Sequence, residues 1–89
     1  MQYRLGRYEE AEKNLRRALE KTPRDPTVHD HLAEVLIKQS KVRDAVGQWE
    51  VSLKEWATSS PAEMRPDEIA QVKKKLEAAK TRLAREARQ

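Results

Sequence analysis

Apolar residues recur every three or four positions in four separate stretches of this 89-residue chain. That spacing places them on one face of a helix, with polar residues on the other face. The four stretches are residues 8–21, 25–39, 42–57 and 66–88. The pattern predicts an all-α domain of about four helices, with the third helix, which carries Trp49 and Trp56, contributing most to the core.

Prolines and capping residues set the expected ends of these helices. Pro23 ends the first one, because it disfavours helical geometry in the preceding residue and cannot donate to the helical ladder. Asp25 suits the N-cap of the second helix, and Pro26 suits its first position. Residues 58–65 form the one long connection that the pattern predicts.

The chain also repeats itself. A shift of 34 residues, which carries Gly6 onto Ser40, aligns the first stretch with the third. Small, basic, apolar, acidic and alanine positions then coincide in register. The coincidences are Arg7 with Lys41, Tyr8 with Val42, Glu10 with Asp44, Ala11 with Ala45, Leu15 with Trp49, and Leu19 with Leu53. This period and order resemble the tetratricopeptide repeat (TPR), a unit of two antiparallel helices joined by a tight turn.

The resemblance covers residues 5–57. The segment LGRYEEA, with Leu15, Ala18 and Pro23 after it, looks like the turn, second helix and closing proline of one unit. Residues 28–56 look like a complete second unit. The sequence departs from the family pattern at His29, Ser40, Ser52 and Ala57, where the family usually has Trp, Gly, Ala and Pro. The alternative is a generic antiparallel helical bundle.

The resemblance implies an α-solenoid of antiparallel helical hairpins. It divides the single domain into a partial repeat (1–23), a full repeat (24–57), a linker (58–65) and a C-terminal capping helix (66–89). We therefore expect a C-terminal fragment of a TPR protein with about one and a half repeats. The first helix of the first unit is expected to lie outside this chain.

Composition narrows the class of protein. The chain has no cysteine, which excludes disulfides and thiolate sites. No apolar run approaches the length of a membrane span, and the fragment carries no targeting signal. We expect a soluble protein that is cytoplasmic by default, although the sequence does not fix the compartment of the parent protein.

No motif predicts catalysis, a cofactor or a metal. His29 and His31 are separated by about 200° around a helix, so they cannot bind one metal side by side. The serines Ser59 and Ser60 have no apparent His/Asp partners and suit a capping role. With only two glycines, the chain has no phosphate-binding loop. We therefore predict a protein that is not an enzyme.

In TPR proteins the first helix of each unit lines a concave groove that binds peptides or proteins. By resemblance, the groove residues are Thr27, Asp30, His31, Glu34, Ile37 and Lys38. The predicted function is a protein-interaction scaffold. Since Asp30 and Glu34 are acidic, a basic or mixed-charge partner fits better than a C-terminal carboxylate. The sequence does not identify that partner.

Two other functions stay open. The first is self-association of two copies through the face of the first helix that carries Tyr8, Leu15 and Leu19, which its missing neighbour would leave uncovered. The second is weak nucleic-acid binding by the last helix, which holds seven Lys/Arg against four Asp/Glu. Nucleic acid is disfavoured, because the basic run 73–75 has no interleaved aromatic residues for base stacking.

The last helix has its own apolar stripe, with residues spaced by three and four positions. The stripe consists of Ile69, Val72, Leu76, Ala79 and Leu83. It predicts packing onto the helix of Trp49 and Trp56, and a coiled-coil seam is the alternative.

Overall fold

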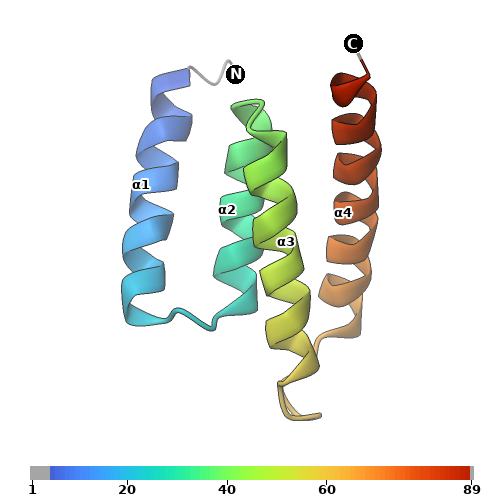
Figure 1. The fold of residues 1–89 in the computed structure, drawn as a ribbon. Coiled ribbons are helices and arrows are strands. Elements are labelled where there is room, and N and C mark those ends of the chain that lie inside the picture. Colours follow the sequence, from blue (N-terminus) through green and yellow to red (C-terminus); the bar gives the residue numbers. More distant parts are fainter. Residues whose placement is uncertain (1–4, 89) are drawn as a thin grey trace.

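The computed structural model describes residues 5–88, with side chains from Arg7 onward. The described residues form four α-helices and no strand (Figure 1). The helices are α1 (Leu5–Lys21), α2 (Pro26–Lys38), α3 (Val42–Ala57) and α4 (Pro66–Ala87). The all-α prediction is confirmed, as are the ends of the helices to within a few residues.

One boundary differs from its prediction. The helix α1 begins at Leu5, so Gly6 and Arg7, predicted as the turn of the first unit, are helical. Leucine and arginine are strong helix formers and no proline interrupts the stretch, which offsets the weak helix propensity of Gly6. The equivalent turn of the second unit does form, because Ser40 has a φ of 62° in the left-handed region that favours glycine.

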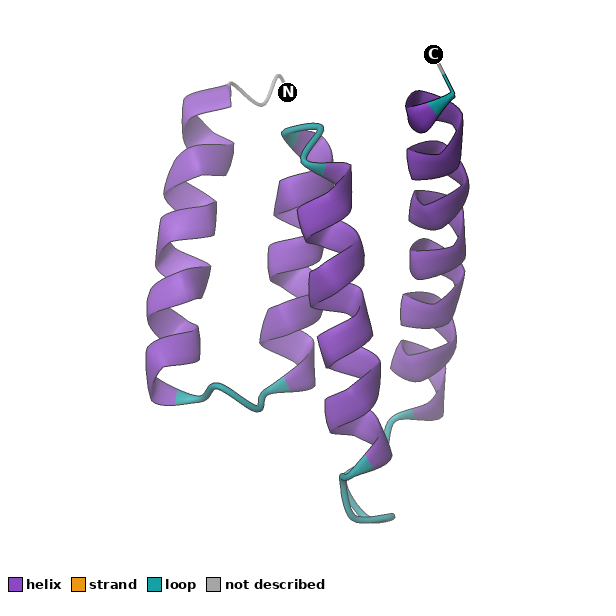
Figure 2. Cartoon of the chain, in the orientation of Figure 1, coloured by secondary structure: helices purple, strands orange, loops and turns teal. Residues whose placement is uncertain are grey.

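Successive helices run in opposite directions and lie side by side (Figure 1). The helix α2 packs between α1 and α3, and α4 packs on α3, which confirms the predicted packing of the last helix. The α1–α2 and α3–α4 loops lie at one end of the molecule, and the α2–α3 loop lies at the other (Figure 2). Antiparallel hairpins of this kind are the arrangement expected of a TPR-like solenoid.

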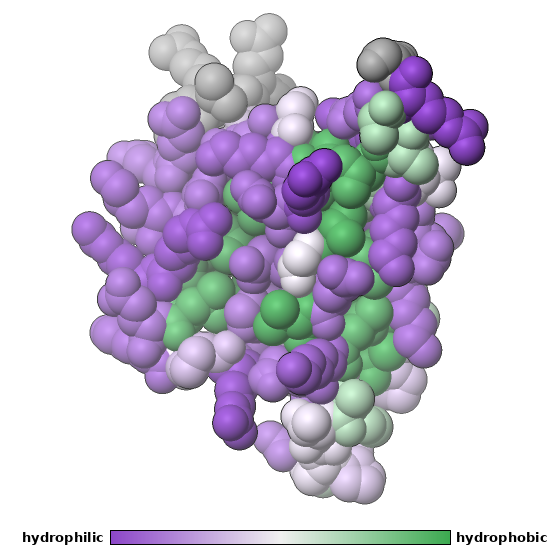
Figure 3. All heavy atoms as spheres, in the orientation of Figure 1, coloured by the Kyte–Doolittle hydropathy of each residue, from purple (hydrophilic) through white to green (hydrophobic). Residues whose placement is uncertain are grey.

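The core lies between α2, α3 and α4, and side chains of α1 pack against its edge. Its buried members are Leu32, Ala33, Leu36, Val42, Ala45, Val46, Trp49, Val72, Leu76 and Ala79. The partly buried residues Leu15 and Leu19 of α1 pack against this cluster. On the face shown in Figure 3, apolar side chains gather in bands between the helices, and polar side chains cover the rest.

Two polar side chains of the predicted second repeat are buried where the family pattern has other residues. His29 is 8% exposed; its Nε2 donates to the carbonyl oxygen of Pro23 (2.8 Å), and its Nδ1 lies 2.7 Å from Oε1 of Gln48. Ser52 is fully buried and its hydroxyl donates to the carbonyl oxygen of Pro26 (2.8 Å). His29 therefore connects α2 to α3 and to the α1–α2 loop.

Candidate interaction groove

A groove runs along α2, with α4 as its opposite wall at one end and residues of α1, α3 and α4 around the other end. Its first part, the acidic end, is a hollow of about 320 Å³. Four residues of α2 and four of α4 line it: Thr27, Asp30, His31, Glu34, Asp67, Glu68, Gln71 and Lys75. The adjoining part, the apolar end, has a volume of about 610 Å³. It shares His31, Glu34 and Lys75 with the acidic end and adds Tyr8, Val35, Ile37, Lys38 and Trp49.

Asp30 joins three helices at the floor of the groove. It is 8% exposed, and its Oδ1 accepts a hydrogen bond of 2.8 Å from Nε1 of Trp49 in α3. The same oxygen lies 3.2 Å from Nζ of Lys75 in α4. A buried carboxylate needs such partners, because burial without them carries a large desolvation cost. Asp30 therefore holds the groove together.

Lys75 is shared between the two acidic residues of α2. Its Nζ lies 2.6 Å from Oε1 of Glu34 as well as 3.2 Å from Oδ1 of Asp30. Burial alone would lower the pKa of Lys75, but the hydrogen bonds to Glu34 and Asp30 outweigh it and raise the pKa above its usual value. Lys75 is therefore charged at neutral pH and is committed to these partners.

The acidic end keeps a negative balance despite Lys75. Four carboxylates line it against that one ammonium group. Glu68 accepts from the Thr27 hydroxyl (3.2 Å) and pairs with the exposed Arg65 (3.2 Å), whereas Asp67 is exposed in the first turn of α4. This end of the groove therefore attracts positive charge.

The structure brings together all six groove residues predicted from the sequence. His31 and Lys38 are exposed, and Thr27, Glu34 and Ile37 are partly exposed. Asp30 differs from the other five, because it is buried at the floor of the groove, where α3 and α4 both contact its carboxylate. Whether these six residues bind a partner stays a prediction.

The half of the groove contributed by α4 was missed at the level of the sequence. Asp67, Gln71 and Lys75 recur every fourth residue, and this spacing places them on one face of α4. Such a polar stripe beside the apolar stripe of the same helix could have marked them as groove residues.

The three residues of the predicted self-association face share one side of α1, and each of them has neighbours in the fold. Tyr8 lines the apolar end of the groove, whereas Leu15 and Leu19 pack against the core from α1 and stay partly exposed. Self-association stays a hypothesis, which light scattering of the chain in solution tests directly.

Glu12 connects α1 to the turn between α2 and α3. Its side chain is 15% exposed and accepts from Nε2 of Gln39 (2.9 Å), Nζ of Lys41 (3.2 Å) and Nε of Arg16 (2.9 Å). Burial acts to raise the pKa of Glu12, but these hydrogen bonds outweigh it and hold the pKa at about 2, against a usual value of 4.5.

We expect Glu12→Gln to reduce the pH dependence of stability in acid. A lowered pKa stabilises the folded state above pH 4.5, and this contribution is lost as the pH falls from 4.5 to about 2. The variant should lose about 1–2 kcal/mol of unfolding free energy at neutral pH and almost nothing at the acid limit. Urea unfolding at several pH values across this range measures the free energy of unfolding of the variant and of the parent chain. Glu10→Gln, at an exposed position of the same helix, is the control, and an equal loss for both variants would contradict the assignment.

Neither a nucleophile nor a metal site is apparent in the described part of the chain. The Ser59 hydroxyl donates to the carbonyl oxygen of Glu55 (3.1 Å), and the Ser60 hydroxyl donates to Oε1 of Glu63 (2.7 Å). Among residues 5–88 no three His, Asp or Glu side chains are grouped to hold a metal ion. None of the described helices is both long and apolar enough to cross a membrane.

Comparison with known proteins adds one finding. Residues 1–40 match a family model described as TPR repeat. The matched range includes α1 and α2, and therefore the α2 side of the groove. No curated protein and no solved structure matches the chain.

Proposed function

We propose that this chain, whose residues 1–40 match a family model described as TPR repeat, is a non-catalytic module that binds a segment of a partner protein in the groove along α2. The family in general serves protein–protein interaction. The observation that carries the proposal is the joining of an apolar hollow to an acidic one along α2, through the residues that the two hollows share.

The apolar end suits a large apolar side chain of the partner. Ile37 and Val35 line it together with Trp49 of α3. Ile37 is partly exposed although it lies on the polar side of α2. An apolar side chain that docks here would remove this concave apolar surface from water. Such burial stabilises a complex by about 25 cal/mol per Å² of apolar surface.

The acidic end suits a basic side chain of the same segment. Asp67 is exposed there, and Glu34 uses Oε1 for Lys75, which leaves Oε2 to accept from a partner. A carboxylate of the partner fits poorly, because the cation within this end is already paired with Asp30 and Glu34. The favoured ligand is thus a segment with a lysine or arginine near a large apolar residue.

Selection of peptides from a random display library tests this function. We expect the chain to enrich segments with that combination, and calorimetry then gives their affinities. Ile37→Ser should weaken binding by about tenfold, since the loss of one buried aliphatic contact amounts to about 1.4 kcal/mol. Glu34→Lys with Asp67→Lys should weaken it further and make it less sensitive to salt. Asp30 is left unchanged in this test, because its substitution would disturb the fold.

Val51→Ser is the matched control. Val51 is 37% exposed on α3 and lines neither end of the groove. Its substitution should leave the affinity unchanged. If Ile37→Ser and Val51→Ser bind the selected peptides equally well, with both variants folded by circular dichroism, the groove is not the binding site.

A further inference from the structure

The groove continues beyond its apolar end. A third hollow of about 260 Å³, which we name the alanine hollow, adjoins that end and shares Ile37, Trp49 and Lys75 with it. Three residues of α4 complete its lining: Ala78, Ala79 and Arg82. The two alanine side chains are single methyl groups, so they leave space beside Ile37. The groove therefore offers two adjoining places for apolar side chains of a partner.

One face of α4 runs along the groove from the acidic end to the alanine hollow. Asp67, Gln71, Lys75, Ala78 and Arg82 lie on this face, because they follow one another at spacings of four, four, three and four residues. Asp67 and Arg82 are 15 residues apart, which corresponds to about 22 Å along the helix axis. An extended segment of about seven residues spans this length.

The two ends of this face differ in charge. Four charged residues line the apolar end and the alanine hollow: Glu34, Lys38, Lys75 and Arg82. Glu34 and Lys75 pair with each other at 2.6 Å, so the positive charges of Lys38 and Arg82 dominate there. This end of the groove therefore attracts negative charge, whereas the end that carries Asp67 attracts positive charge.

Arg82 is accessible to a carboxylate of a partner. Its Nε pairs with Glu86 of the same helix at 3.2 Å, and its Nη2 donates to the Ser40 hydroxyl at 3.3 Å. The side chains of Arg82 and Glu86 are 44% and 46% exposed, and such exposed ion pairs contribute little to stability. A guanidinium group has five N–H donors in a planar fork, so donors of Arg82 remain for a ligand beside these two contacts.

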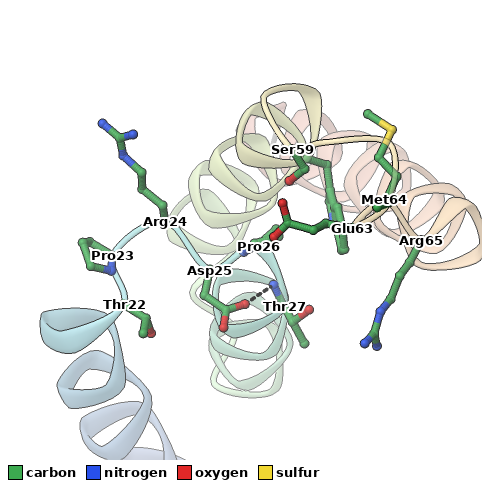
Figure 4. A pocket seen from close by; sticks show the side chains of 12 residues that line it. Thr22, Pro23, Arg24, Asp25, Pro26, Thr27, Ser59, Glu63, Met64 and Arg65 are labelled. Carbon is green, nitrogen blue, oxygen red and sulfur yellow. Dashed lines mark hydrogen bonds between the residues drawn. The ribbon is translucent and has the colours of Figure 1, made fainter.

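The opposite end of the groove is open. Thr27 lines the acidic end and also a hollow of about 950 Å³ where the α1–α2 and α3–α4 loops meet (Figure 4). Arg24 and Arg65 line that hollow together with Asp25 and Glu63, so two positive charges stand against two negative ones. A bound segment can therefore continue past its basic residue, and the ligand need not be a chain terminus.

On the premise that the groove binds a partner segment, we infer that this segment is extended and carries charges of both signs. Its basic residue faces Asp67, two large apolar residues occupy the apolar end and the alanine hollow, and an acidic residue binds Arg82. Alternate residues of an extended chain point to the same side, about 6.6 Å apart. A basic, two apolar and an acidic residue at every second position therefore match the order of sites along the groove.

Calorimetry with the peptide acetyl-KTLTLTE-amide tests the inference on the 89-residue chain. The blocked ends leave its side chains as the only charges, and seven residues are too few for a stable helix in water. The comparison peptide acetyl-KTLTLTQ-amide lacks the acidic residue. It should bind about two- to fivefold more weakly at low salt, and high salt should reduce the difference.

Two pairs of variants locate the contacts. Arg82→Gln should remove the difference between the two peptides, whereas Lys80→Gln should preserve it. Ala78→Leu fills the alanine hollow and should weaken both peptides by about five- to tenfold, whereas Ala84→Leu should leave their affinities unchanged. All four positions are exposed on α4, and the two controls line neither the groove nor the alanine hollow. Circular dichroism checks that each variant is folded.

Equal affinities of the two peptides for the parent chain would overturn the inference, and the function proposed for the groove would stand if Ile37→Ser still weakened both. A difference that persists in Arg82→Gln, or an affinity that Ala78→Leu does not lower, would overturn the inference as well. If peptides selected from the display library bind but neither of these two does, the inference alone fails. If no peptide of either kind binds, the proposed function fails with it.

Discussion

Asp30→Ala should lower the free energy of unfolding by about 2–4 kcal/mol, the largest effect that we expect of any polar substitution in this chain. The change removes the acceptor of the Trp49 indole N–H (2.8 Å) and one of the two carboxylates that hold Lys75. A buried donor then lacks a partner, and one of the links between α2 and α4 is lost. Urea unfolding followed by tryptophan fluorescence measures the loss.

Glu34→Ala is the matched control for Asp30→Ala. Glu34 contacts the same lysine at 2.6 Å, but its side chain is 47% exposed, and exposed ion pairs contribute only about 0–1 kcal/mol. Asp30→Asn should restore part of the loss, because the amide oxygen can accept from Trp49. Equal effects of Asp30→Ala and Glu34→Ala would mean that the Trp49 hydrogen bond does not stabilise the groove floor.

The second large effect is expected from Leu76→Ala, which should cost about 2–4 kcal/mol. Leu76 is 6% exposed, and its neighbours along the stripe, Val72 and Ala79, are also buried against the core. Truncation leaves a cavity between α4 and α3. If α4 is an integral part of the domain, the loss appears in the global unfolding transition, which stays a single step.

Leu83→Ala serves as its control within the same helix. Leu83 is only partly buried, so its truncation should cost less than half as much. Two separate transitions in Leu76→Ala, with an unchanged second midpoint, would show that α4 folds independently of the hairpin of α2 and α3.

Local rules account for most of the helix ends. The prediction that Asp25 caps α2 is confirmed, because its Oδ1 accepts from the backbone N–H groups of Thr27 (2.9 Å) and Val28 (3.3 Å). The start of α1 was predicted less well, because the family resemblance placed a turn at Gly6, which lies within α1 although glycine is a weak helix former.

The buried polar contacts could not be predicted in the same way. A helical projection of α2 predicts a single apolar face that is buried. In the structure α2 lies between α1 and α3, so a wider part of its surface is buried. Asp30 and its partner Trp49 are 19 residues apart in the sequence, and Lys75 is 45 residues away from Asp30. Such a contact depends on how two hairpins stack, and the period of a single helix carries no information about it.

The same limit applies to the groove. Its α2 residues followed from the resemblance to a known repeat, whereas Asp67, Gln71 and Lys75 belong to a helix that does not align with that repeat. Their place became clear only when α4 was seen beside α2 across the acidic end.

The central claim, that a partner segment binds in the groove along α2, is tested most directly by isoleucine methyl NMR of the chain saturated with a selected peptide. The chain offers two probes: Ile37 at the apolar end of the groove, and Ile69 on α4, which lines neither end. We predict that the Ile37 methyl signal moves and shows contacts with the apolar residue of the peptide, while Ile69 is unchanged. A saturated complex in which the Ile37 signal stays at its free position would contradict the claim.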